Sequence, residues 1–347
     1  MLNFSCEQLT KLKLLKPNIK IHKNSIPIIY LDTCILIEFS RYENGNCDNV
    51  HKNEICELYN TLVSLMKSNH IICVLGNQME EMGSTINRGN ARDFLYKFTN
   101  AIFLEPFEIE KIQIKHGYNA FIKAQAEFSF NTKTIFEKFH YLKNSSIQIN
   151  IPTIYKRERA QKIKEIKYML ADDLNKMKND GKISTDYEKQ LSIELKADFE
   201  VFRYNLEHCN DSIEAYEQNQ YNLGKIYEIT GIDLRIADNE ERKRAVEIYC
   251  NFLLSECHHA LPYVWIRSVL FVLLMQQPNK IIHSDNLDII WASAYLPFVN
   301  YVVTDDKFNN LLNNSGLLTQ YNTKSYSMRT LKKLINELKN DGGYFNA

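Results

Sequence analysis

The sequence has no excess of charge of either sign. Its 347 residues contain 42 Lys plus Arg and 42 Asp plus Glu, which gives a formal net charge of zero. A chain without a basic surplus has no global field that attracts nucleic acid, so any site for a polyanion must be a local patch. The 45% hydrophobic and 24% charged residues are ordinary values for a folded protein, which excludes disorder as the main character of the chain.

Other signals are also missing. The eight cysteines contain no C-x-x-C pair, so we expect scattered reduced thiols. The pair His258-His259 lacks a second pair of ligands at zinc spacing, so we expect a structural role for it. Residues 1–7 lack the basic and apolar segments of a signal peptide. The most apolar run, 263–275, is too short to span a bilayer and contains Arg267. We therefore expect a cytoplasmic protein that does not enter a membrane.

The first hundred residues alternate between strand and helix patterns. Residues 26–31 and 71–75 are continuous apolar runs of the kind found in buried parallel strands. Helical sequence follows the first run from Ile35, stops at the polar residues 42–46 and resumes near Glu54. After the second run, Asn77 can cap a helix that begins at Gln78. This order predicts a parallel sheet.

The middle of the chain is long, charged and helical. Five apolar residues recur there at helical spacing while Lys and Glu fill the other face: Ile163, Ile166, Leu170, Leu174 and Met177. The segment 179–182 has the composition of a turn between two helices. We expect an α-helical insertion over residues 106–245, flanked by the two parts of one α/β domain at 1–105 and 246–347. The insertion is a candidate contact surface for a protein partner or for a second copy of the chain.

The α/β pattern returns near the end. The sequence predicts a helix from Asp285 to about Tyr295, a strand at 301–304, a helix at 308–312 and a last strand at 317–326. Ser327 is expected to cap a final amphipathic helix whose apolar face carries Leu331, Leu334, Ile335 and Leu338.

Acidic residues follow each of these strands or open the next helix. Asp32 ends the first apolar run, Glu80 and Glu81 follow the second, Asp285 and Asp288 open a helix, and Asp305 and Asp306 follow the strand at 301–304. The carboxyl ends of parallel strands meet at one edge of a sheet, where open α/β folds bind ligands. Carboxylates gathered there repel one another unless cations lie between them. Mg²⁺ or Mn²⁺ ions held in this way can activate water and stabilise a leaving oxygen in phosphodiester hydrolysis.

Four segments in this order resemble the PIN-domain superfamily of nucleases. The segments are Ile29-Tyr30-Leu31-Asp32-Thr33, Glu80-Glu81-Met82, Asp288-Ile289-Ile290-Trp291-Ala292 and Val302-Val303-Thr304-Asp305-Asp306. The resemblance covers roughly residues 26–100 and 260–340 and implies a three-layer PIN-like α/β domain with a parallel sheet. It also implies a metal-dependent nuclease, with RNA a more frequent substrate in the family than DNA.

The resemblance implies a set of metal ligands. They would be Asp32, Glu81 or Glu80, Asp288 and Asp306, and Asp285, one helical turn before Asp288, can face the same pocket. Asp305 would point away from Asp306 if the strand continued, so we rank it lower. Cys34 stands where the family often has Asn or Ser and is a poor Mg²⁺ ligand.

Each feature also has another explanation. Asp32 can be a strand-end acid that caps a helix, and Glu80, Glu81, Asp285 and Asp288 can be helix-opening acids. The strongest basic stretch can hold a phosphate backbone or form a solvated helix face; it contains Lys156, Arg157, Arg159, Lys162, Lys164 and Lys167. Arg203 and His208 have the spacing of metal-independent HEPN-type ribonucleases. A degenerate PIN-like fold that serves as a protein-interaction module is the non-enzymatic alternative, and metal binding separates it from the nuclease.

Overall fold

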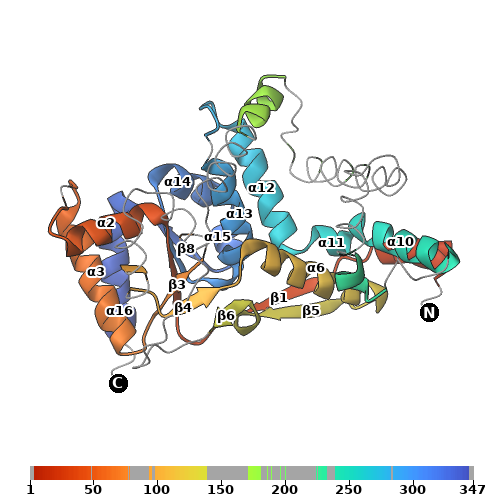
Figure 1. Cartoon of the computed structure of the whole chain (residues 1–347), viewed down its shortest axis with the longest axis horizontal. Helices are drawn as coiled ribbons and strands as arrows, with labels where there is room; N and C mark the ends of the chain where they lie inside the picture. The colour runs from red at the N-terminus through yellow and green to blue at the C-terminus, as the bar shows by residue number, and fades with distance from the viewer. Residues whose placement is uncertain are drawn as a thin grey trace. The chain divides into compact units, whose positions relative to one another are not determined.

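A computed structural model (Figure 1) describes residues 4–47, 49–76, 94–95, 98–138, 171–180, 226–232, 239–282 and 284–343, with the single positions 78, 186, 189, 196, 200 and 224. The chain divides into two compact units. Residues 1–20, 107–130 and 183–272 form the first, and residues 21–106, 131–182 and 273–347 form the second. The expected boundaries differ from this division, because residues 1–20 and 246–272 group with the helical unit and residues 131–182 with the α/β unit.

The second unit is built on a six-stranded sheet in the order β6-β4-β3-β2-β7-β8. Neighbouring strands among five of these run parallel, and the edge strand β6 pairs antiparallel to β4. The strands are β2 (Ile28–Leu31), β3 (Ile72–Leu75), β4 (Ala101–Phe103), β6 (Phe136–Lys138), β7 (Tyr301–Val303) and β8 (Lys324–Tyr326). The parallel α/β fold expected from the sequence is therefore confirmed.

The strand order contains a reversal at β2. From β2 the chain first builds outward through β3 and β4, and later returns to the other side of β2 with β7 and β8. The last residues of the two central strands, Leu31 and Val303, lie opposite each other in the register. Such a reversal opens a crevice at the carboxyl ends of the strands, and this is where open α/β sheets bind ligands.

Helices cover both faces of this sheet, which explains why the inner strands β2, β3, β4 and β7 are apolar at every position. Ile29 and Leu31 point into a core made with α2 (Thr33–Glu43), α3 (Lys52–Lys67) and α16 (Leu331–Gly343). Figure 1 shows these three helices side by side. Tyr30 points to the opposite face, where its ring stacks on that of Trp291 in α13 (Asp285–Tyr295) with the ring centroids 4.3 Å apart.

The carboxyl-terminal elements match the sequence with one exception. The helix expected at 308–312 is α14 (Asp306–Asn314). The short η2 (Leu296–Phe298) connects α13 to β7. The strand expected over 317–326 is wrong in its first half, because Gly316 in the left-handed conformation starts a helical turn, α15 (Leu317–Gln320), before β8. A short apolar run of this kind suits a strand and a helical turn equally well.

The final helix is confirmed in place and in orientation. Its expected apolar face is buried, with exposed fractions of 0% for Leu331 and Leu334, 1% for Ile335 and 3% for Leu338. A short turn, η3 (Met328–Thr330), precedes it. Ser327 caps this turn, since its backbone N–H donates to the Thr330 hydroxyl and its side chain accepts from the Thr330 backbone N–H.

The first unit is mainly helical. It contains α1 (Cys6–Lys13), α10 (Asn239–Leu253), α11 (Glu256–His259), nearly all of α6 (Pro106–Ile122) and the larger part of α12 (Pro262–Gln276), whose last residues, 273–276, belong to the second unit. Strands β1 (Asn18–His22) and β5 (Glu127–Asn131) pair as a separate sheet, and η1 (Thr132–Ile135) follows β5 in the second unit. The side chain of Leu261 packs so closely on Gly117 that an added Cβ would meet it at 2.8 Å. Among the described helices, none has the length and apolar character needed to cross a bilayer.

Candidate functional site

Asp32 lies at the point where the two central strands end. It follows β2 directly and is the N-cap residue of α2, with 8% of its surface exposed. Its Oδ1 accepts a hydrogen bond from the Thr33 N–H at 2.5 Å, and its Oδ2 accepts one from the Thr304 hydroxyl at 2.7 Å. The Asp32 N–H donates to the Val303 carbonyl at 2.8 Å. These bonds fix the carboxylate at the reversal point of the sheet.

Asp285 and Asp288 open α13 and are almost completely buried, at 6% and 8% exposure. Oδ1 of Asp288 accepts a hydrogen bond of 3.2 Å from the indole N–H of Trp291. Because Trp291 stacks on Tyr30 of the central strand, this bond ties Asp288 to the sheet. The opening of the helix thus carries two buried acids, Asp285 and Asp288.

The last acidic pair is placed in the reverse of the expected order. Strand β7 ends at Val303, so the alternation of a continuing strand does not apply to the next residues. Asp305 is the N-cap of α14, accepts a 2.8 Å hydrogen bond from the Phe308 N–H and lines a hollow with Asp285 and Asp288. Asp306 does not line it, has a side chain that is 40% exposed and pairs with Arg329 at 2.8 Å.

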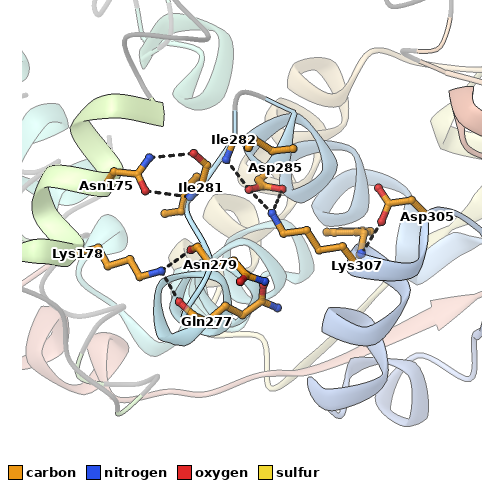
Figure 2. Close-up of polar contacts among 10 residues, drawn as sticks. Asn175, Lys178, Gln277, Asn279, Ile281, Ile282, Asp285, Asp305 and Lys307 are labelled. Carbon is orange, nitrogen blue, oxygen red and sulfur yellow. Dashed lines mark hydrogen bonds and ion pairs between the residues drawn. The ribbon is translucent and has the colours of Figure 1, made fainter.

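The hollow is small, with a cavity volume of about 10 Å³, which is roughly the space of one water molecule. Its lining consists of Leu274, Gln277, Asp285, Asp288, Asp305, Lys307, Phe308 and Leu311. The ammonium group of Lys307 lies 2.6 Å from each carboxylate oxygen of Asp285, as Figure 2 shows. With three carboxylates and one ammonium, the lining carries a net charge of −2. A lining of this charge attracts a cation and repels a free phosphate.

A thiol reports on how close these acids are to one another. Burial raises the pKa of Cys34 well above its usual range, and the charges of Asp32, Asp305 and Asp288 raise this pKa further. The Cys34 Sγ lies 3.8 Å from Oδ2 of Asp32. Since three carboxylates act on a single thiol, Asp32 and two acids of the hollow share one electrostatic environment.

The donors in this region suit a hard cation, since they are carboxylate oxygens. Within the described ranges, however, no group of three or more His, Cys, Asp or Glu side chains is arranged to hold a metal ion. Asp285, expected as a ligand, is held by Lys307. Glu80 and Glu81 lie outside the described residues. The donor chemistry therefore fits Mg²⁺ or Mn²⁺, while the described carboxylates alone do not form a complete shell.

Several sequence-based candidates fall outside the described residues. They are Arg203, His208 and the basic stretch of Lys156, Arg157, Arg159, Lys162, Lys164 and Lys167. His258 is buried in the helical unit, where desolvation lowers its pKa to about 3. Sequence analysis missed Lys307, because a lysine that follows two acids gives no signal of a contact with an acid 22 positions away.

Comparison of the chain with protein-family models, with curated proteins and with solved structures gives no match. The function proposed below therefore rests on the residues and the geometry of this chain.

Proposed function

We propose that the chain is a metal-dependent phosphodiesterase of PIN-like type that hydrolyses nucleic acid, RNA in preference to DNA. The observation that carries the proposal is the position of Asp32, which Thr304 holds at the reversal point of a parallel sheet while Asp288 and Asp305 act on the same thiol. Acids collected at such a point repel one another, and a protein retains this arrangement readily when a cation offsets the repulsion.

In this proposal Asp32, Asp288 and Asp305 hold Mg²⁺ or Mn²⁺, together with Glu81 or Glu80. The bound ion would activate a water molecule and stabilise the charge of the leaving oxygen. The neighbouring side chains keep the ligands in place: the Thr304 hydroxyl holds Asp32 and the Trp291 indole holds Asp288. Because Asp32 and Asp288 are each only 8% exposed, little water screens their charges, which strengthens their attraction for a cation.

The charge of the hollow supports a requirement for metal. A phosphodiester carries negative charge, and the net −2 lining would repel it without a cation between them. Further contacts to the substrate backbone must come from basic side chains elsewhere. The stretch with Lys156, Arg157, Arg159, Lys162, Lys164 and Lys167 is the candidate, and charge reversal at Arg159, Lys162 and Lys164 should flatten the salt dependence of RNA binding.

The proposal is tested by neutralising single acids in the full chain. Asp32→Asn and Asp288→Asn should abolish Mg²⁺- or Mn²⁺-dependent cleavage of RNA while leaving the thermal midpoint unchanged or slightly higher, because crowded like charges are relieved. Asp306→Asn is the matched control, since Asp306 pairs with Arg329 outside the hollow. Retention of metal-dependent cleavage by Asp32→Asn at the wild-type rate would rule out this mechanism.

Two observations favour a non-catalytic alternative. Lys307 neutralises one acid of the hollow, and Cys34 stands next to Asp32 in place of an oxygen ligand. A PIN-like fold without activity could serve as a protein-interaction module. Calorimetric titration with Mn²⁺ separates the two, because the enzyme should bind the ion and the degenerate fold should not.

Cleavage that persists in EDTA and is lost in His208→Ala would instead support the HEPN-like use of Arg203 and His208.

A further inference from the structure

A short part of the middle region is attached to the α/β unit by specific side-chain contacts. Residues 171–179 are helical, and we name residues 171–180 the brace segment. The side-chain amide of Asn175 donates to the Ile281 carbonyl and accepts from the Ile281 N–H, both at 2.9 Å, as Figure 2 shows. It also donates to the Ala171 carbonyl at 2.7 Å. One side chain thus satisfies both backbone groups of Ile281.

A second contact holds the same segment further along the chain. The ammonium group of Lys178 donates to the carbonyls of Gln277 and Asn279, the latter at 2.7 Å. Carbonyls at the end of a helix lack partners within the helix and attract a cation. Gln277 and Asn279 follow the last residue of α12, so Lys178 docks the brace segment just beyond the end of that helix and makes no hydrogen bond to Ile281.

The backbone that Asn175 holds leads directly to the hollow. The N–H of Ile282 donates to Oδ2 of Asp285 at 2.8 Å, and the N–H of Asp285 donates back to the Ile282 carbonyl at 3.1 Å. The two oxygens of Asp285 in turn hold Lys307. A continuous series of hydrogen bonds and one ion pair therefore runs from Asn175 to Lys307 (Figure 2).

We propose that Asp285 holds Lys307 and is not a metal ligand, and that Asn175 is the positioning residue that keeps Asp285 in place. This inference rests on the proposed function. Among the lining residues only Lys307 is basic, and Asp288 and Asp305 line the same hollow. An ammonium released from Asp285 would pair with those two carboxylates and compete there with a divalent cation. The brace segment thereby keeps the cation site open.

The test is a calorimetric titration of the full chain with Mn²⁺ alone. Asn175→Ala leaves every charge of the hollow in place, and it should weaken Mn²⁺ binding by about tenfold, within the range of couplings between linked side chains. Lys307→Met should bind Mn²⁺ at least as tightly as the wild type. The double variant Asn175→Ala with Lys307→Met should match Lys307→Met alone, because no competing ammonium is present.

Lys178→Met is the matched control. It removes the other docking contact of the brace segment but leaves the bonds between Asn175 and Ile281 intact, so its Mn²⁺ affinity should stay within about twofold of the wild type. The inference is overturned if Asn175→Ala binds Mn²⁺ like the wild type, or if Lys307→Met fails to restore binding in the double variant.

A second measurement does not depend on metal or activity. The N–H groups of Ile282 and Asp285 form hydrogen bonds within residues 282–285. Asn175→Ala should speed amide hydrogen exchange at these two residues, while Lys178→Met should not. If the wild type neither binds Mn²⁺ nor cleaves RNA, the proposed function fails, and the positioning of Asp285 is still judged by this exchange. Unchanged exchange in Asn175→Ala would overturn the inference whatever the outcome for the metal.

Discussion

The hydroxyl group of Thr304 donates a 2.7 Å hydrogen bond to Oδ2 of Asp32 across 272 positions of the sequence. Thr304 is completely buried, and its own N–H donates to the Tyr326 carbonyl at 3.0 Å, so its hydroxyl has a fixed position. The bond joins the ends of the two central strands and sets the direction of the Asp32 carboxylate. The orientation of Asp32 thus depends on a residue that itself carries no charge.

Replacing Thr304 by valine should separate orientation from charge. Thr304→Val keeps the shape of the side chain and removes only the donor, so we expect a stability loss of about 0.5–1.5 kcal/mol and a larger relative loss of metal-dependent cleavage. Thr304→Ser retains the hydroxyl and should keep most of the activity. Denaturant unfolding and cleavage rates are measured on the same samples. Equal activity of the valine and serine variants would contradict this role.

Asp305 and Asp306 should differ sharply despite being adjacent. Asp305 lines the hollow, so Asp305→Asn should weaken Mn²⁺ binding, whereas Asp306→Asn should not, because that carboxylate pairs with Arg329. Asparagine caps a helix about as well as aspartate, so the first substitution removes charge without loss of the α14 cap. Titration calorimetry compares the two variants. A stronger effect of Asp306→Asn would restore the order expected from the sequence.

Cys34 should act as a reporter of the acidic region. Burial and the charges of Asp32, Asp305 and Asp288 raise its pKa, and only the thiolate reacts quickly, so alkylation by iodoacetamide should be slow at pH 8. Asp288→Asn removes one of these charges and should speed the reaction, about tenfold for each unit by which the pKa falls. Peptide mass spectrometry follows this cysteine separately from the others. An unchanged rate would place Asp288 too far away to act on the thiol.

The helical unit should lose stability in acid through His258. Burial, followed by the charges of His259 and Arg267, lowers its pKa from 6.5 to about 3. Between these values the unfolded chain binds a proton that the folded chain does not. Stability should therefore fall as the pH drops from 6.5 toward 3, by up to about 1.4 kcal/mol per pH unit from this group.

His258→Phe tests this directly. The ring centroids of His258 and Phe252 lie 5.2 Å apart. Phenylalanine at position 258 keeps an aromatic ring beside Phe252 and cannot take up a proton. Urea unfolding between pH 4 and pH 7 should give a flatter pH dependence for the variant than for the wild type, even if its stability at pH 7 is lower. Parallel curves would assign the acid sensitivity to other groups.

The central strands of the sheet could be predicted from the sequence, because parallel strands buried on both faces leave unbroken apolar runs, but the short strands β4 and β6 were not predicted. Residues 26–31 and 71–75 contain β2 and β3, and the helix expected from Asp285 to about Tyr295 is α13. The error at 317–326 arose because Leu317 and Leu318 are apolar neighbours in a helical turn, which the left-handed Gly316 begins. The grouping of residues 1–20 with the helical unit depends on long-range packing, which local sequence patterns do not contain.

The site could be predicted only in part. Asp32, Asp285 and Asp288 are found at a strand end and a helix start, as their local sequences indicated. The sequence ranked Asp306 above Asp305 because the resemblance pointed to Asp306 and because a strand continuing to these residues would turn Asp305 away from it; β7 instead ends at Val303, and Asp305 caps α14. The partnership of Lys307 with Asp285 and the contacts of Asn175 join residues far apart in the chain, which only the folded structure brings together.

The place of β2 between β3 and β7 has a consequence for synthesis of the protein. β3 follows β2 closely in the chain, but the neighbour on the other side is made only after the long stretch that separates Asp32 from Thr304, 272 positions later. At about 5–20 residues per second, a ribosome needs roughly 14 to 54 s to cover that distance. Throughout this time one edge of the strand has no native neighbour to pair with. The acidic edge therefore takes its final form late in translation, and whatever it binds must wait until then.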